Sequence, residues 1–187
     1  MKKLLKKKFK NNHCIIPARK GSKGIKNKNI IKYLGKPLIQ HTFDIAKKIE
    51  NNFDVLVSTD SDKIKKLAIK NNFYFIGKRP KKLSNDKAET KDVLKFELKR
   101  IEKLKNKKYK HILLLQATCP HRNIKKINFS LKKIKSKLYD SVVSVTKVEA
   151  EHPLRMKIFK SKYLKNYIKQ NKENMKPRQS LPEVYLR

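Results

Sequence analysis

Short apolar runs alternate with longer amphipathic stretches along most of this 187-residue chain. The runs are rich in branched residues and bounded by polar ones, which is typical of strands: Cys14–Ala18, Val55–Ser58, Phe73–Ile76, His111–Leu115 and Ser141–Val145. The stretches between them carry apolar residues three and four positions apart, which predicts helices with one buried face: Leu38–Ile49, Asp62–Lys70, Asp92–Lys105 and Ile124–Lys135. Ser61 and Thr90 precede two of these helices and are predicted N-caps. The alternation indicates an α/β fold, a mostly parallel sheet with helices on both faces.

The length of the chain allows one domain with a hydrophobic core and leaves little for a second. Hydrophobic residues make up only 38% of the chain, but they are concentrated in the runs above, so we predict a folded protein rather than a disordered one. No apolar segment approaches the length that spans a membrane, and the basic start lacks the apolar core of a signal peptide. Cys14 and Cys119 lack the spacing of a metal pair and favour a reduced, cytoplasmic protein in which Cys119 is a buried thiol.

The formal net charge of +36 raises the hypothesis of a nucleic-acid-binding protein, because lysines that neutralise phosphates bind polyanions. Only seven of the 51 basic residues are arginine, and the lysines are spread over nearly every segment. Dedicated nucleic-acid readers add arginine forks or stacking aromatics at a defined patch. We therefore favour a solvated lysine surface with no specific nucleic-acid partner, and keep a basic nucleic-acid-associated protein as the alternative.

Two of the four glycines, Gly21 and Gly24, lie in one basic turn, Arg19–Gly24, directly after the first predicted strand. Ligands of open parallel sheets bind at the carboxyl ends of the strands, and glycine there lets backbone N–H groups approach an anion. The turn matches neither the Walker A pattern nor the dinucleotide-binding pattern. On chemistry alone it is either a phosphate-binding loop or an ordinary basic turn between a strand and a helix.

A series of motifs, in order along the chain, is similar to the acylneuraminate cytidylyltransferases, the CMP-sialic acid synthetases. The resemblance begins at about residue 13 and rests on these segments: Ile15–Ile30, Gly35–Ile39, Val57–Asp60, Arg79–Asp86 with Thr90, Leu114–Arg122, Asp140–Val145, His152–Leu154 and Pro177–Tyr185. It implies the doubly wound, Rossmann-like nucleotidyltransferase fold of the nucleotide-diphospho-sugar transferases. It also implies transfer of CMP from CTP to an acidic nine-carbon sugar, with release of pyrophosphate.

The resemblance also implies a role for each matching residue. The catalytic residues would be Arg19 and Lys23, which stabilise pyrophosphate, and Lys28 at the α-phosphate. The nucleotide would be held by Ala18, Gly21, Ser22, Gly24, Asn29, Arg79, Asn85, Asp86 and Thr90. The sugar would be held by Gln116, Thr118, Arg178 and Gln179, with the guanidinium of Arg178 on its carboxylate. Four of the seven arginines fall inside these motifs, and arginine offers phosphate or carboxylate a planar fork that lysine lacks.

By the same resemblance, residues 13–187 form a cytidylyltransferase domain behind a basic tail, residues 1–12. Residues 148–176 form an excursion that pairs two copies as a homodimer. The related enzymes continue into a further strand and an aspartate pair that holds Mg²⁺, whereas this chain ends at Arg187, so we expect a truncated member and assign no metal ligand. Two hypotheses remain open for a member of this kind: a working transferase, or an inactive remnant that still binds the nucleotide. The identity of the acidic sugar is also open.

Overall fold

The computed structural model describes residues 10–22, 24–148, 151–169 and 180–186. The chain divides into two compact units, Met1–Phe129 and Ser130–Arg187, and each has strand pairing of its own. Among the described residues, no helix has both the length and the apolar composition needed to cross a membrane.

The first unit is built on a parallel sheet whose central strand is β1 (Asn12–Pro17). β4 (Phe53–Ser58) pairs with one side of β1 and β5 (His111–Leu114) with the other. A bridge between Leu56 and Tyr74 extends the sheet beyond β4. The order across the sheet is therefore Tyr74, β4, β1, β5, so the chain first moves outward from β1 and then crosses to its other side. That crossing makes a topological switch point, the place where ligands bind in open α/β sheets.

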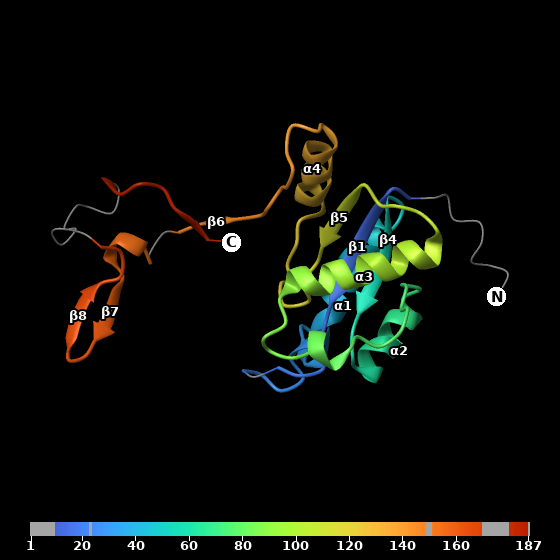
Figure 1. Ribbon diagram of the computed structural model, residues 1–187, viewed down its shortest axis with the longest axis horizontal. Coiled ribbons are helices and arrows are strands. Elements are labelled where there is room, and N and C mark those ends of the chain that lie inside the picture. The colour runs from blue at the N-terminus through green and yellow to red at the C-terminus, as the bar shows by residue number, and fades with distance from the viewer. Residues whose placement is uncertain (1–9, 23, 149–150, 170–179, 187) are drawn as a thin grey trace. The chain divides into compact units, whose positions relative to one another are not determined.

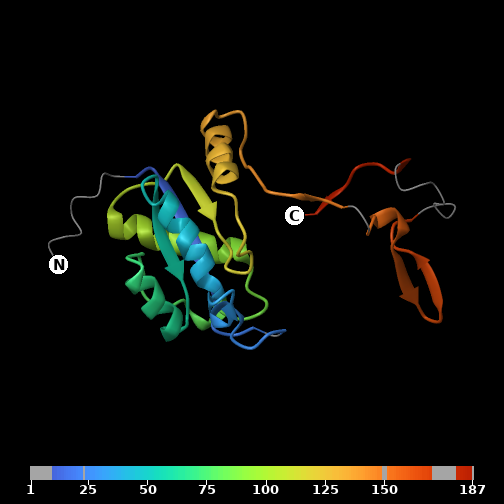
Figure 2. The same cartoon turned by 180° about the vertical axis from the view of Figure 1, so that it is seen from behind.

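Helices cover both faces of this sheet, which confirms the predicted α/β class (Figure 1, Figure 2). α3 (Thr90–Lys105) crosses one face and α1 (Leu38–Ile49) the other. α2 (Asp62–Lys70) lies beside α1, where the side-chain amides of Gln40 and Asn71 exchange hydrogen bonds of 3.1 and 3.3 Å. A fourth helix, α4 (Ile124–Lys135), spans the boundary between the two units. The bounds of α1, α2 and α4 are those that the apolar spacing predicts.

Strands β1 and β4 of the first unit carry continuous apolar runs because they are buried on both faces. Every residue of β4 is buried, and the middle of β1 is fully buried because helices cover both sides. From α1, Ile39, Phe43 and Ala46 point into this core at spacings of four and three, as an amphipathic helix requires. Phe43 meets Phe73 edge to face, with 5.2 Å between the ring centroids.

A two-residue turn joins the short antiparallel strands β2 (Lys32–Tyr33) and β3 (Lys36–Pro37). Leu34 and Gly35 both have positive φ, 45° and 79°, which is the geometry of a tight hairpin turn that favours glycine. This hairpin leads directly into α1, and its Tyr33 side chain contacts His121 in the loop after β5.

In the second unit, β6 (Thr146–Lys147) pairs with β9 (Tyr185–Leu186), and β7 (Lys157–Lys160) forms a hairpin with β8 (Tyr163–Asn166); both pairs are antiparallel. His152 serves the packing of this unit. Its Nδ1 accepts a hydrogen bond from the Leu154 amide at 3.1 Å, and its Nε2 lies 2.9 Å from the Pro182 carbonyl oxygen.

Three predictions of secondary structure are wrong. Ser141–Val145 is exposed and extended without strand pairing, because an apolar run becomes a strand only where a neighbour supplies backbone hydrogen bonds. Phe73–Ile76 contributes only the bridge at Tyr74. Thr90 is the first residue of α3 rather than its N-cap, which is Glu89 and makes no side-chain capping bond.

Ser61 is confirmed as the N-cap of α2, because its hydroxyl accepts a hydrogen bond from the Ile64 amide at 3.4 Å. Replacing Ser61 with alanine leaves that amide without its acceptor in a buried position, and we expect the free energy of unfolding to fall by about 1 kcal/mol. Urea denaturation measures this change. Ser136→Ala is the matched control, since the Ser136 hydroxyl, just after α4, donates to the Lys133 carbonyl in the last turn of that helix at an exposed position; an equal loss in the two variants would contradict the capping role.

Candidate functional site

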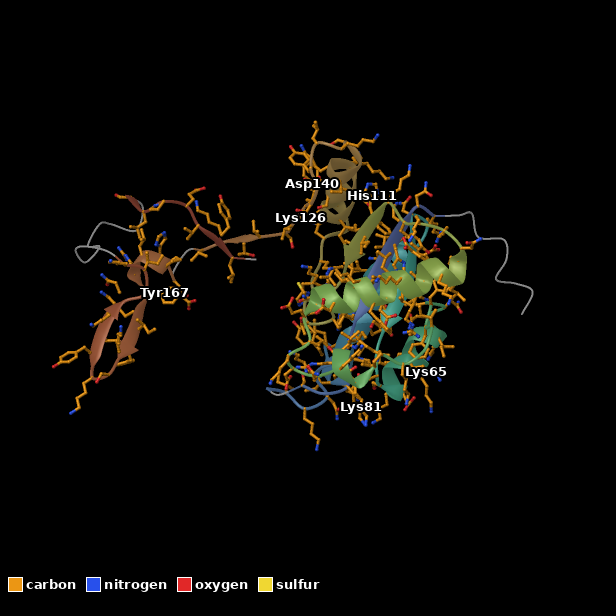
Figure 3. The ribbon with its side chains drawn as sticks, viewed as in Figure 1. Lys65, Lys81, His111, Lys126, Asp140 and Tyr167 are labelled. Carbon is orange, nitrogen blue, oxygen red and sulfur yellow. The ribbon has the colours of Figure 1, made fainter. Side chains whose placement is uncertain are left out.

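The carboxyl ends of the three parallel strands meet at one edge of the first unit. The Ala18 amide, just past β1, donates to the Ser58 carbonyl at the end of β4 at 2.9 Å, and the Leu115 amide, just past β5, donates to the Ile15 carbonyl at 3.1 Å. Figure 3 marks the two ends of the sheet: Lys81 lies at this edge, and His111 lies at the opposite end. The loops that leave this edge carry most of the residues singled out in the sequence.

The loop after β1 is anchored at its start and near its end. The Lys20 amide donates to Asp60 Oδ1 at 2.7 Å, which ties the loop to the segment after β4. The buried side-chain amide of Asn29 donates to the Arg19 carbonyl at 2.9 Å from a short 3₁₀ helix, Lys28–Ile30. These two bonds fix the backbone on either side of the glycine turn.

A second segment, which follows the turn after Tyr74, brings Arg79 to the same edge. The Arg79 amide donates to the Thr59 carbonyl at 3.0 Å, and its Nε donates to Ser84 Oγ at 3.2 Å. The side chain is nearly enclosed, with 5% of the residue exposed. Burial lowers the pKa of the Arg79 guanidinium, while the negative charges of Asp60 and Glu97 oppose that shift.

An ion pair joins the two segments, since the guanidinium of Arg19 contacts the carboxylate of Asp86. Both side chains are about one third exposed, so the pair contributes little to folding stability. The pair instead holds Arg19, in the loop after β1, against Asp86, in the segment that follows Arg79. The edge therefore holds one partly exposed guanidinium, that of Arg19, and one nearly enclosed guanidinium, that of Arg79, with Asp60 and Asp86 close to them.

The loop after β5 is held by the half-buried Arg122 and by the β2–β3 hairpin. The Arg122 guanidinium donates to the Gln116 carbonyl and, at 3.0 Å, to Thr42 Oγ1 on α1; burial lowers the pKa of this guanidinium. The Tyr33 hydroxyl lies 2.7 Å from His121 Nε2. The exposed side chains of Gln116 and Thr118 thus stand on a loop whose backbone is fixed from two sides.

The family of the chain can be assigned from its similarity to known protein families. The family model described as cytidylyltransferase matches residues 13–185, nearly the whole chain. The chain belongs to the cytidylyltransferase family. This confirms the resemblance read from the sequence motifs.

Individual relatives agree with this assignment. The cytidylyltransferase chain is 38% identical over 144 residues to the N-acylneuraminate cytidylyltransferase of Streptococcus agalactiae serotype III, an alignment that covers 75% of the chain and 33% of that relative. It is 29% identical over 174 residues to the pseudaminic acid cytidylyltransferase of Campylobacter jejuni serotype O:23/36, covering 93% of the chain and 74% of that relative. The chain thus spans about a third of the length of the first of these relatives.

The fold agrees with that of a solved nucleotidyltransferase. The structure of 4-diphosphocytidyl-2C-methyl-D-erythritol synthase superposes with a TM-score of 0.58 at 12% identity and covers 87% of the cytidylyltransferase chain and 70% of the other. At this identity the likeness concerns the fold alone, and it confirms the predicted Rossmann-like α/β fold.

The structure brings several of the predicted site residues together at the carboxyl edge: Arg19, Asn29, Arg79 and Asp86, with Lys28 in the 3₁₀ helix beside them. Asn85 folds back on its own turn, where it bonds the Lys82 carbonyl and the Lys87 amide, and Thr90 is exposed at the start of α3. Lys23, Arg178 and Gln179 lie outside the described residues. The roles of all these residues in binding and catalysis stay predictions.

The backbone around the glycine turn shows, in its described residues, no feature that requires glycine or leaves the Ala18 amide free for a ligand. Ala18 uses its amide within the sheet rather than leaving it open to a ligand. A Cβ added at Gly21 or Gly24 would meet nothing within 4 Å, so their need for glycine has no steric reason within the described structure; Ser22 between them is half-buried. The expectation that Cys119 is buried is wrong, since Cys119 is exposed and only Cys14 is buried.

The expected Mg²⁺ does not find a fitting set of ligands in the part of the chain that the structure describes. No group of three or more histidine, cysteine, aspartate or glutamate side chains there could hold a metal ion. The two carboxylates at the edge are already engaged, Asp60 by the Lys20 amide and Asp86 by Arg19. Mg²⁺ in nucleotide sites is usually held by one or two carboxylates together with the phosphates, so the expected Mg²⁺ stays a prediction.

Proposed function

We propose that this chain is a nucleotidyltransferase that joins CMP from CTP to an acidic nine-carbon sugar, an N-acylneuraminate or related nonulosonate, and releases pyrophosphate. The observation that carries the proposal is that Arg19, beside the switch point between β1 and β5, is paired at the carboxyl edge with Asp86 of the segment that carries Arg79. Guanidinium forks match the geometry of phosphate oxygens, and the switch point is where such folds bind their ligands. Membership of the cytidylyltransferase family supports CTP as the donor.

In the proposed reaction, a hydroxyl oxygen of the sugar attacks the α-phosphorus of CTP. The bond from that phosphorus to pyrophosphate breaks, and the hydroxyl proton passes to water. Chemistry of this kind asks the protein for alignment and charge neutralisation rather than for a covalent intermediate. Arg19 and Lys23 would neutralise the leaving pyrophosphate, Lys28 the α-phosphate, and Arg79 would contact the nucleoside end. Triphosphate then competes with Asp86 for the Arg19 guanidinium.

The acceptor would lie against the loop after β5. Gln116 and Thr118 are exposed there on a backbone that Arg122 and Tyr33 hold in place. The sequence motifs further predict that Arg178 and Gln179 contact the sugar, with Arg178 on its carboxylate. The names of two relatives, for N-acylneuraminate and for pseudaminic acid, support an acidic sugar of this class. Because the reaction needs CTP and the described cysteines are free thiols, we place the chain in the cytoplasm.

We also propose that the chain acts as a homodimer, through the β7–β8 hairpin of its second unit. The hairpin and its flanks expose large apolar side chains, among them Phe159, 76% exposed, Tyr163, 72% exposed, and Tyr167, labelled in Figure 3. Apolar surface of this kind marks an interaction site, and a second copy presents the same surface. Light scattering after gel filtration should give a dimer for the wild type and a monomer for a Phe159→Ser, Tyr163→Ser double variant. Leu104→Ser, on α3, is the exposed apolar control; a monomeric wild type at micromolar concentration contradicts the proposal.

The experiment that tests the proposed reaction is pyrophosphate release by the purified chain with CTP and a panel of nonulosonic acids, with and without Mg²⁺. Release with one sugar, and none when ATP or UTP replaces CTP, supports the transferase and names the acceptor. CTP binding without release under any pairing favours the inactive nucleotide-binding alternative. Tight binding to any polyanion that falls steeply with salt, with no preference for CTP, favours the nucleic-acid-associated alternative.

A further inference from the structure

The carboxylate of Glu97, in the second turn of α3, is buried with 1% of the residue exposed, although none of the site motifs includes it. Its Oε1 accepts a hydrogen bond from Ser58 Oγ at 2.8 Å, and its Oε2 accepts one from Arg100 Nη1 at 3.2 Å. Burial raises the pKa of Glu97, while the Ser58 hydroxyl and the charges of Arg100 and Arg79 oppose that shift. A buried carboxylate is costly unless it is paired in this way, so its presence calls for a reason.

Arg100 carries the connection from Glu97 to the turn before Arg79. Its guanidinium donates to the Ile76 carbonyl and, at 3.5 Å, to the Gly77 carbonyl. Gly77 has a φ of 113°, and a Cβ added there would lie 2.6 Å from Arg100 Nη2. Glycine at this position therefore allows both the backbone conformation and the close approach of the guanidinium.

The two contacts of Glu97 reach the two segments that build the carboxyl edge. Ser58 is the last residue of β4, directly before Thr59 and Asp60, and the Gly77 turn leads to Arg79. The same segments meet again where the Arg79 amide donates to the Thr59 carbonyl. The buried carboxylate of Glu97 and its partly exposed partner Arg100 thus connect the end of β4 to the turn before Arg79.

We infer that Glu97 and Arg100 are positioning residues of the nucleotide site, which hold Arg79 in register with the end of β4. The inference rests on the proposed function, in which Arg79 contacts the nucleoside end of CTP. The pyrophosphate end is held by the loop after β1, which has an anchor of its own in the bond from the Asn29 side chain to the Arg19 carbonyl. A change at Glu97 therefore acts on the binding of CTP and leaves the binding of inorganic pyrophosphate unchanged.

The test compares the dissociation constants of CTP and of inorganic pyrophosphate in Glu97→Gln, Glu97→Ala and Gly77→Ala. Glu97→Gln keeps an acceptor oxygen but loses the charge, and we expect it to weaken CTP binding about tenfold, the effect of one charge-assisted hydrogen bond. Glu97→Ala and Gly77→Ala should weaken CTP binding further, so glutamine at position 97 should retain part of the affinity that alanine loses. The dissociation constant of pyrophosphate should change by less than about twofold, because Asn29 holds the loop after β1 without help from Glu97.

Glu102→Gln is the matched control, since Glu102 lies on the same helix and bonds Lys108 Nζ and the Tyr109 amide, away from the carboxyl edge. We expect it to change neither dissociation constant. Equal losses for CTP and pyrophosphate, or unchanged CTP binding in Glu97→Ala, would overturn the inference.

Hydrogen exchange of the Arg79 amide separates this inference from the proposed function. Glu97→Ala should speed that exchange relative to Glu102→Gln, whether or not the wild type binds CTP, because the bond to the Thr59 carbonyl loses its support. Absence of CTP binding by the wild type would sink the proposed function alone. Unchanged exchange in Glu97→Ala would overturn the positioning role of Glu97.

Discussion

Replacing Arg19 with alanine is expected to lower kcat/KM for CTP about 100-fold, the usual cost of losing one donor that stabilises charge in a transition state. The same variant should weaken the binding of inorganic pyrophosphate, because the loop after β1 holds the phosphate end in the proposed reaction. Its free energy of unfolding should change by less than about 1 kcal/mol, since the Arg19–Asp86 pair is exposed. Pyrophosphate release, calorimetric titration and urea denaturation measure the three quantities.

Lys36→Met is the matched control for this variant. It breaks another exposed ion pair of the first unit, between Lys36 and Asp44, which joins β3 to α1. Similar stability in the two variants, with a loss of CTP turnover and binding only in Arg19→Ala, fits the assigned role. Wild-type kinetics and wild-type phosphate binding in Arg19→Ala would show that Arg19 has no part in the site.

Acid is expected to destabilise the first unit by about 3 kcal/mol between pH 6.5 and pH 4, because of one buried histidine. His13 on β1 is fully buried, and burial lowers its pKa from 6.5 to about 4. Its Nδ1 lies 2.8 Å from the Asp54 carbonyl, so Nδ1 carries the proton, and Nε2 is the buried side-chain atom without a hydrogen-bond partner in the described structure. Below pH 6.5 His13 is protonated in the unfolded chain, whereas in the folded chain it stays neutral down to about pH 4. The free energy of unfolding therefore falls as the pH falls through this interval.

Urea denaturation at steps between pH 7 and pH 4.5 measures this slope. In His13→Asn the amide can still donate to the Asp54 carbonyl but cannot titrate, so its stability should stay nearly flat over that interval. The variant should be less stable than the wild type at pH 7, since it loses the stacking of His13 on Tyr109, 4.7 Å between ring centroids. A wild-type slope retained in His13→Asn would contradict the assignment. Asp54, whose pKa is lowered by hydrogen bonds from Lys107 and Tyr109 although burial opposes them, adds its own loss only below about pH 4.

The periodicity of the apolar residues was sufficient to predict the helices of the first unit, because each buries one stripe against the sheet. α1 and α2 begin and end where the spacing places them. The same reasoning failed for Ser141–Val145, since its composition is that of a strand while pairing depends on a neighbouring segment that composition does not reveal. It also extended Phe73–Ile76 too far, because only Tyr74 finds a partner there.

The residues of the candidate site could be predicted where the motifs carry them, as for Arg19 and Arg79, but their contacts could not. Nothing in the sequence links Arg19 to Asp86, since such a pair forms only when two loops leave the same edge of a sheet. Glu97 was missed for another reason. It lies in a helix rich in charged residues, and its burial depends on Ser58 at the end of a strand 39 positions earlier.

The two ends of the central strand β1 lie next to residues with different roles. His13 lies near its start and Arg19 two residues beyond its finish, so about 20 Å of extended backbone separates them, more than a Debye length at physiological salt. A substitution that makes the first unit tolerant of acid therefore leaves the field around the phosphates almost unaltered. Stability in acid and the proposed binding of the phosphate end of CTP can therefore change independently, although both depend on one short segment of the chain.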